Sequence, residues 1–176
     1  MRFRLILLLV GGILLTAVVL LGVSLSQTQK SIRSIVQSYM LTTAKDNGAI
    51  MDTVLDAKGA EVLDDADALS GLLANVKVED MESSYAYLVS ADGTMLYHPT
   101  ADKIGSPVEN EVVTALVEDL KGGKIADPAC VEYNFKGVVK YAAYYINPQG
   151  SYILVVSADQ SDAFSAVTQT RNYLIG

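Results

Sequence analysis

A run of uncharged residues near the N-terminus constrains this chain more than any other feature. Leu5–Ser24 holds no charged residue and is almost wholly apolar. As a helix rising 1.5 Å per residue, it spans roughly 30 Å, the thickness of the hydrocarbon core of a bilayer. A cleaved signal peptide has a shorter apolar region and a small-residue cleavage site, which Leu25, Ser26 and Gln27 do not form. We expect residues 1–26 to be a cytoplasmic tip and an uncleaved transmembrane anchor.

Charge bears on orientation and on partners. Arg2 and Arg4 precede the apolar run and favour a cytoplasmic N-terminus, although Lys30 and Arg33 follow it closely. The whole chain has a formal net charge of −7. An acidic body argues against binding to nucleic acid and to anionic lipid headgroups. We therefore expect a single-pass protein of the cell membrane, as given, with an extracytoplasmic body.

Helical periodicity continues after the anchor. Apolar residues keep helical spacing over residues 27–75, and no proline interrupts them. Weak points are Asp46–Gly48 and Lys58-Gly59, and we expect a break near one of the two. This stretch is predicted to form long stalk helices whose apolar stripe is buried on the chain's own sheet, on a second subunit, or on both.

Strand and turn signals dominate residues 76–162, the predicted sheet domain. Ser84–Pro99 contains two β-rich runs around Asp92-Gly93, a dipeptide that favours tight hairpin turns. Its first run alternates so that its tyrosines share one face. Two further turns are expected at Lys136-Gly137 and at Asn147–Gly150. They separate three more strand-like runs.

One helix is expected between the first hairpin and the later strands. Ser106 is placed to cap it, Pro107 to occupy its first position and Glu109 to complete a capping box, while Gly122-Gly123 ends it. The pattern predicts an α+β fold with a five-stranded antiparallel sheet and flanking helices. Residues 163–176 are expected to continue a helix towards a second membrane segment missing from this sequence.

The order of these pieces resembles a known family. SADGTMLYHP, the IGSP sequence before the helix, VEYNFKG, KYAAYY and ILVVSAD together resemble the extracellular Cache sensor domain of bacterial chemotaxis receptors. The resemblance runs from about Gln27 to Asp162. It implies a PAS-like sheet, a small-molecule pocket, a homodimer and a chemoreceptor that passes a helix shift across the membrane. A second membrane helix and a cytoplasmic signalling domain would also belong to such a receptor.

Seven residues are candidates for ligand contact. Tyrosine combines apolar surface with a hydroxyl, which suits a pocket for a small polar ligand, although tyrosine is also a common strand residue. His98 is the only histidine and could equally be structural, and Asp159 could equally cap a following helix. The candidates are Tyr87, Tyr97, His98, Tyr133, Tyr141, Tyr144 and Asp159.

The resemblance also shows a departure that bears on the ligand. In amino-acid-binding members of the Cache family, an aspartate placed like Asp159 holds the ligand's amino group, while an arginine and a tryptophan hold its carboxylate. This chain has no tryptophan and no arginine between Arg33 and Arg171. Lys136 or Lys140 could supply a point charge instead. We expect a small organic acid or a similar polar metabolite as the ligand.

Catalysis and metal binding are not expected. His98 and Cys130 are each the only residue of their type, so a zinc site of histidines and cysteines cannot form, and no GxSxG motif is present. We expect no enzyme activity and no cofactor. The alternative outputs are a histidine kinase or a cyclic-nucleotide enzyme. A pilin-like subunit fits less well, because no acidic residue precedes Asp46.

Overall fold

The computed structural model describes residues 2–162 and divides into two units after Ile35. The first unit contains only the N-terminal part of helix α1 (Arg2–Lys58). Over residues 10–25 its apolar side chains are exposed, with Leu15 at 67% and Leu20 at 69%. Among the described residues, α1 is the one helix long and apolar enough to cross a bilayer. The predicted helix at residues 163–176 lies outside the described residues.

The second unit begins with the remainder of α1, which ends at Lys58 where Gly59 takes a φ of 91°. A short 3-10 helix η1 (Ala60–Asp64) and helix α2 (Ala66–Leu73) follow. Asp65 caps α2 by accepting a hydrogen bond from the Ala68 backbone N–H at 2.9 Å. Of the two predicted weak points, the break therefore falls at Lys58-Gly59.

A five-stranded antiparallel sheet forms the centre of this unit and confirms the predicted α+β fold. Its spatial order is β2-β1-β5-β4-β3. The strands are β1 (Tyr85–Ser90), β2 (Met95–Tyr97), β3 (Ala129–Phe135), β4 (Val138–Ile146) and β5 (Tyr152–Asp159). The predicted turns are confirmed as well. Gly93 has a φ of 97°, and Lys136 and Gly137 both have positive φ, as a tight hairpin requires.

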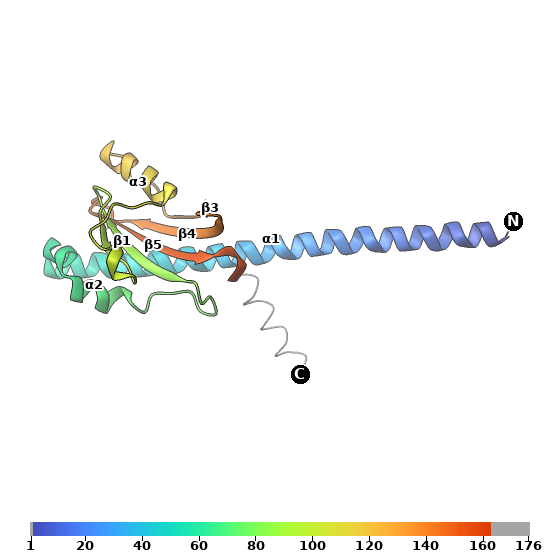
Figure 1. Ribbon diagram of the computed structural model, residues 1–176, viewed down its shortest axis with the longest axis horizontal. Helices are drawn as coiled ribbons and strands as arrows, with labels where there is room; N and C mark the ends of the chain where they lie inside the picture. The colour runs from blue at the N-terminus through green and yellow to red at the C-terminus, as the bar shows by residue number, and fades with distance from the viewer. Residues whose placement is uncertain (1, 163–176) are drawn as a thin grey trace. The chain divides into compact units, whose positions relative to one another are not determined.

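The two faces of the sheet are covered by different helices (Figure 1). On one face, Tyr87, Val89 and Val155 pack in a core with helix α3 (Glu111–Lys121). The second-unit part of α1 lies on the other face. Tyr152 of β5 points to that face, and its hydroxyl donates to the Gly48 carbonyl of α1 at 2.9 Å. The alternation of strand residues thus assigns each side chain to one of two different environments.

The start of α3 corrects the predicted helix boundary. The helix begins at Glu111 and is capped by Asn110, not by Ser106. Residues 106–108 are extended instead: the Met95 N–H donates to the Ser106 carbonyl and the Val108 N–H donates to the Gly93 carbonyl, both at 2.9 Å. These bonds to the first hairpin outweigh the local capping signal. A short 3-10 helix η2 (Ala101–Lys103) lies between β2 and this segment.

Candidate ligand-binding cavity

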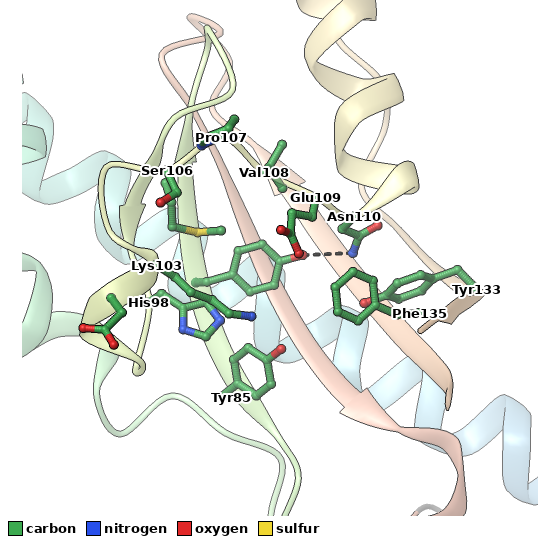
Figure 2. A pocket seen from close by; sticks show the side chains of 13 residues that line it. Tyr85, His98, Lys103, Ser106, Pro107, Val108, Glu109, Asn110, Tyr133 and Phe135 are labelled. Carbon is green, nitrogen blue, oxygen red and sulfur yellow. Dashed lines mark hydrogen bonds between the residues drawn. The ribbon is translucent and has the colours of Figure 1, made fainter. Parts of the chain in front are cut away.

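The extended segment before α3 leaves a cavity of about 220 Å³ above the sheet (Figure 2). Pockets for drug-sized ligands occupy about 300–1,000 Å³, so this one suits a smaller molecule. It is lined by side chains from β1, β2, β3 and the connection between β2 and α3: Tyr85, Tyr87, Met95, His98, Asp102, Lys103, Ser106, Pro107, Val108, Glu109, Asn110, Tyr133 and Phe135.

Tyr87 and Asn110 connect the sheet to the helix inside the cavity. The Asn110 amide donates to the Tyr87 hydroxyl oxygen at 3.0 Å, while its carbonyl oxygen accepts from the Val112 backbone N–H at 2.9 Å. Both side chains are buried. Burial raises the pKa of Tyr87 well above its usual value, so the hydroxyl keeps its proton and can act as a donor. One asparagine therefore caps α3 and orients a cavity tyrosine.

His98 is held as a neutral donor. Burial, followed by the charge of Lys103, lowers the pKa of His98 to about 4. Its Nδ1 accepts a hydrogen bond from the Thr100 backbone N–H at 2.9 Å. A neutral imidazole carries its proton on the other nitrogen, which leaves Nε2–H as the donor. The ring stands edge-on to Tyr85 with centroids 5.1 Å apart.

A second phenol, that of Tyr133, lines the sheet side of the cavity. Burial raises the pKa of Tyr133 more than the nearby Ser157 hydroxyl lowers it, so this phenol also stays protonated. Ser157 is fully buried and does not line the cavity, but its hydroxyl lies close enough to the Tyr133 phenol to lower the pKa of that phenol. Of these two hydroxyls, the Tyr133 phenol is the one that lines the cavity and is available to a ligand atom.

The charges at the cavity are arranged unevenly. Lys103 forms no ion pair with another described residue, and Figure 2 shows its side chain beside the His98 ring. Glu109 forms an exposed ion pair with Lys136 at 2.8 Å, and this pair, followed by the charge of Lys103, lowers the pKa of Glu109. Asp102 also lines the opening and is exposed. The cavity lining therefore holds one ammonium, which forms no ion pair with a described residue, together with two carboxylates and several neutral hydrogen-bond donors.

Three of the seven predicted contact residues line this cavity, namely Tyr87, His98 and Tyr133. Tyr144 lies on the same sheet face but in the core with α3, away from the cavity lining. The position of the three tyrosines follows from the alternation along β1, β3 and β4, whereas His98 lies just after β2. Whether any of them contacts a ligand stays a prediction.

The other three predicted residues lie elsewhere. Tyr97 pairs with Leu88, and Tyr141 pairs with Ala158, on the face opposite the cavity. Asp159 is on the cavity face and forms an ion pair with Lys140. The structure thus does not bring the seven residues together in one site.

Sequence reasoning missed three residues that shape the cavity: Tyr85, Lys103 and Asn110. Tyr85 had a signal, since it shares the alternation of Tyr87. Lys103 lies in an irregular connection, whose path no periodic pattern predicts. Asn110 was hidden by the stronger capping pattern that starts at Ser106.

The donor-rich lining indicates an anion or a strongly polar ligand. Carboxylates accept charge-assisted hydrogen bonds from ammonium, imidazole and phenol groups. Among residues 2–162, no group of three or more His, Cys, Asp or Glu side chains could hold a metal ion. The chemistry available at the cavity is recognition by hydrogen bonds and charge.

Comparisons with known proteins find similarity at the level of structure. No model of a protein family matches the chain, and no curated protein matches it. It is similar to the ligand-binding domain of Mlp24 with asparagine, with 19% identity, a TM-score of 0.43, and coverage of 58% of this chain and 38% of that chain. The periplasmic sensory domain of the Campylobacter jejuni chemoreceptor Tlp1 matches at 19% identity and TM-score 0.44, covering 57% and 36%.

A third match is the structure described as the extracellular domain of the histidine kinase mmHK1S-Z3. It has 21% identity and a TM-score of 0.47, and the match covers 59% of this chain and 39% of that chain. The resemblance to chemoreceptor sensor domains expected from the sequence is thus found again as structural similarity. The chain spans less than half the length of each of these chains. At such identities and TM-scores, the likeness carries no inference about ligand, partner or output.

Proposed function

We propose that this chain is the extracytoplasmic ligand-sensing region of a membrane receptor, and that its cavity binds a small carboxylate. The observation that carries the proposal is the Lys103 ammonium, which reaches to the cavity without a carboxylate partner among the described residues. Neutral His98 and the protonated phenols of Tyr87 and Tyr133 supply donors beside it. A carboxylate would accept from the ammonium and from these donors at once.

The apolar part of α1 supports a membrane-anchored receptor with the N-terminus in the cytoplasm. Ligand binding would shift helix positions by no more than its differential affinity for the two states. A chemoreceptor is the output we favour, working as a homodimer and without catalysis in this region. The alternatives are the sensor of a histidine kinase or of a cyclic-nucleotide enzyme. If the protein continues after Gly176, the residues there would distinguish these outputs.

The direct test is calorimetric titration of the full chain in lipid nanodiscs. The probes are acetate, butyrate, malonate and glutarate, with their uncharged amides as controls. At least one carboxylate should bind while its amide does not. Lys103→Gln should weaken that binding by about 10- to 150-fold, since a hydrogen bond to a charged group contributes about 1.5–3 kcal/mol. Lys121→Gln removes the same charge from an exposed position outside the cavity lining and should change the affinity less than twofold.

The outcome that would sink this proposal is a parent chain that binds none of the four acids. Equal loss in both lysine variants would also contradict it, because the effect would then be one of net charge. Phenylalanine variants of Tyr87 and Tyr133 should bind more weakly than the parent. The same titration of Tyr97→Phe, Tyr141→Phe and Tyr144→Phe tests the remaining tyrosines predicted from the sequence.

A further inference from the structure

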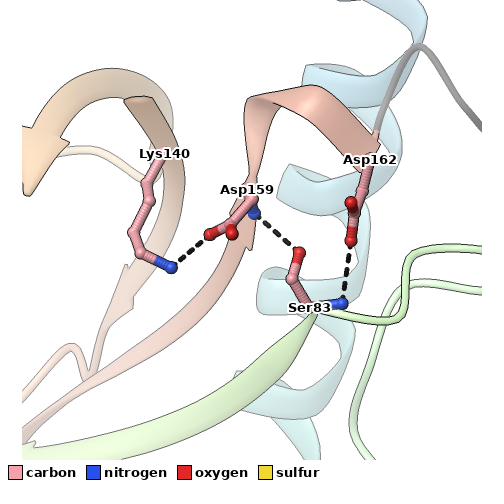
Figure 3. Close-up of polar contacts among 4 residues, drawn as sticks. All are labelled: Ser83, Lys140, Asp159 and Asp162. Carbon is pink, nitrogen blue, oxygen red and sulfur yellow. Dashed lines mark hydrogen bonds and ion pairs between the residues drawn. The ribbon is translucent and has the colours of Figure 1, made fainter. Parts of the chain in front are cut away.

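Four polar residues form a cluster where β5 ends, which we call the Ser83 clasp: Ser83, Lys140, Asp159 and Asp162 (Figure 3). The Asp159 N–H donates to the Ser83 hydroxyl oxygen, and the Ser83 N–H donates to the Asp162 carboxylate, both at 2.9 Å. The Lys140 ammonium pairs with the Asp159 carboxylate. The clasp therefore joins the loop before β1, strand β4 and the first residues after β5.

Lys140 lies between this clasp and the cavity. It stands directly opposite Tyr133 on β3 and directly opposite Asp159 on β5. Directly opposite residues of antiparallel strands share a face, so Lys140 is on the cavity face. Its ammonium is 5.9 Å from the centroid of the Tyr85 ring. Lys140 is not itself a lining residue, but its neighbours Tyr85 and Tyr133 both are, so one lysine lies next to the cavity wall and takes part in the clasp.

The Lys140–Asp159 pair is largely shielded from water. The Lys140 side chain is 15% exposed and that of Asp159 is 28% exposed. A shielded cation is destabilised when it loses its ion-pair partner. In the empty cavity, Asp159 is the described residue that forms an ion pair with Lys140, and the charge of Asp162 acts on it more weakly. A carboxylate lying against Tyr85 and Tyr133 would be a second partner for the same ammonium.

We propose that Lys140 is a switch residue, which pairs with Asp159 when the cavity is empty and with the ligand's carboxylate when the cavity is filled. Occupancy then opens the clasp and loosens the hold of Ser83 on residues 159–162. Asp159 thereby competes with the ligand for Lys140, and Asp159 does not contact the ligand. This inference rests on the proposed function, because it needs a carboxylate in the cavity.

The switch predicts that removing a charged residue near the cavity strengthens ligand binding. Asp159 and the ligand's carboxylate would compete for the same Lys140 ammonium, and each would weaken the other's interaction by the same factor. Removing the Asp159 charge should therefore strengthen ligand binding. Asp159→Asn should therefore bind acetate, butyrate, malonate or glutarate about tenfold more tightly than the parent does, again in full-chain nanodiscs. Asp162→Asn is the matched control, since it removes an equal charge from the clasp but no ion pair of Lys140, whose charge is the smallest of the causes that lower the pKa of Asp162. Its affinity should change less than twofold.

The role of the lysine is tested by a second variant. Lys140→Gln should weaken binding, and Asp159→Asn added to it should have no further effect. Hydrogen exchange supplies an independent readout. The carboxylate that binds best should speed exchange of the Ser83 and Asp159 backbone amides in the parent, and leave both unchanged in Lys140→Gln.

Several results would overturn the switch. One is that Asp159→Asn binds the carboxylate no more tightly than the parent does. Another is that Asp159→Asn still tightens binding when it is combined with Lys140→Gln. In both cases the parent chain still binds, so the proposed function survives. A parent that binds none of the four acids overturns both proposals. If Asp159→Asn does not fold, the exchange comparison between the parent and Lys140→Gln decides alone.

Discussion

At the scale of single residues, the cavity is built from side chains that serve two neighbours each. Asn110 caps α3 and also donates to Tyr87, so the helix start and a cavity hydroxyl depend on the same amide. His98 accepts from the Thr100 backbone and keeps its other nitrogen as a donor. Such shared contacts hold the donors in place before a ligand arrives, which reduces the entropy lost on binding.

The protonation of His98 leads to a prediction about pH. Because its pKa is lowered to about 4 from an unfolded value near 6.5, the unfolded chain takes up a proton before the folded chain does. Folding stability from this residue is therefore complete above pH 6.5 and lost as pH falls to 4. We expect the loss to be roughly 1–2 kcal/mol, less than the full linkage value, since the ring lines an open cavity.

This is measurable directly, because His98 is the only histidine in the chain. An NMR titration of the chain with labelled histidine should show one imidazole signal changing near pH 4. The asparagine side chain of His98→Asn can still accept a hydrogen bond from the Thr100 N–H. Urea unfolding should show that this variant loses less free energy of unfolding between pH 6.5 and 4 than the parent does. An imidazole that titrates near pH 6.5 would show that the ring is solvated, contrary to its burial.

At the scale of elements, the contact between α1 and the sheet is unusually close. Asp52 of α1 accepts hydrogen bonds from the Tyr145 hydroxyl and the Asn147 amide, and it shares the one hydrogen of the Tyr152 hydroxyl with the Gly48 carbonyl. Gly48, one turn earlier, touches the Tyr145 ring so closely that a Cβ atom there would lie 2.2 Å from its Cδ1. Glycine at this position allows the helix backbone to rest on the aromatic ring.

Two alanine substitutions should consequently have opposite effects. Gly48→Ala should lower the free energy of unfolding by about 1–3 kcal/mol, because the ring of Tyr145 has to move to admit the methyl group. Gly71→Ala in α2 meets no atom within 4 Å and should raise it by about 0.5–1 kcal/mol through helix propensity. Thermal unfolding followed by circular dichroism measures both. Stabilisation by Gly48→Ala would mean that α1 lies farther from the sheet.

At the scale of the whole molecule, the apolar N-terminal run predicts where the sheet domain lies in a cell. Lys121 is exposed at the end of α3, so Lys121→Cys supplies a reactive thiol. The natural Cys130 is an internal control, since burial raises its pKa to about 12 and leaves almost no thiolate. In intact spheroplasts, a membrane-impermeant maleimide should label Lys121→Cys and not the parent. Labelling that appears only after lysis would place the sheet domain in the cytoplasm.

Much of this fold could be predicted because it follows local patterns. The uncharged run, the alternation Tyr85-Tyr87-Val89 and the turn residues Gly93 and Gly137 each act within a few neighbours along the chain. Period, charge and allowed backbone angles are properties of short segments. The sequence by itself therefore determined the helix that precedes the sheet domain, the five strands and their turns.

Only the tertiary structure decided what forms the cavity. Ser106 and Asn110 both offered caps for α3, and the pairing of residues 106–108 with the first hairpin selected Asn110. That choice kept the segment extended and opened the space in which Lys103 approaches His98. Likewise, the register of β4 placed Lys140 against Asp159. These contacts join residues distant in sequence, and their energies depend on a pairing that no short segment contains.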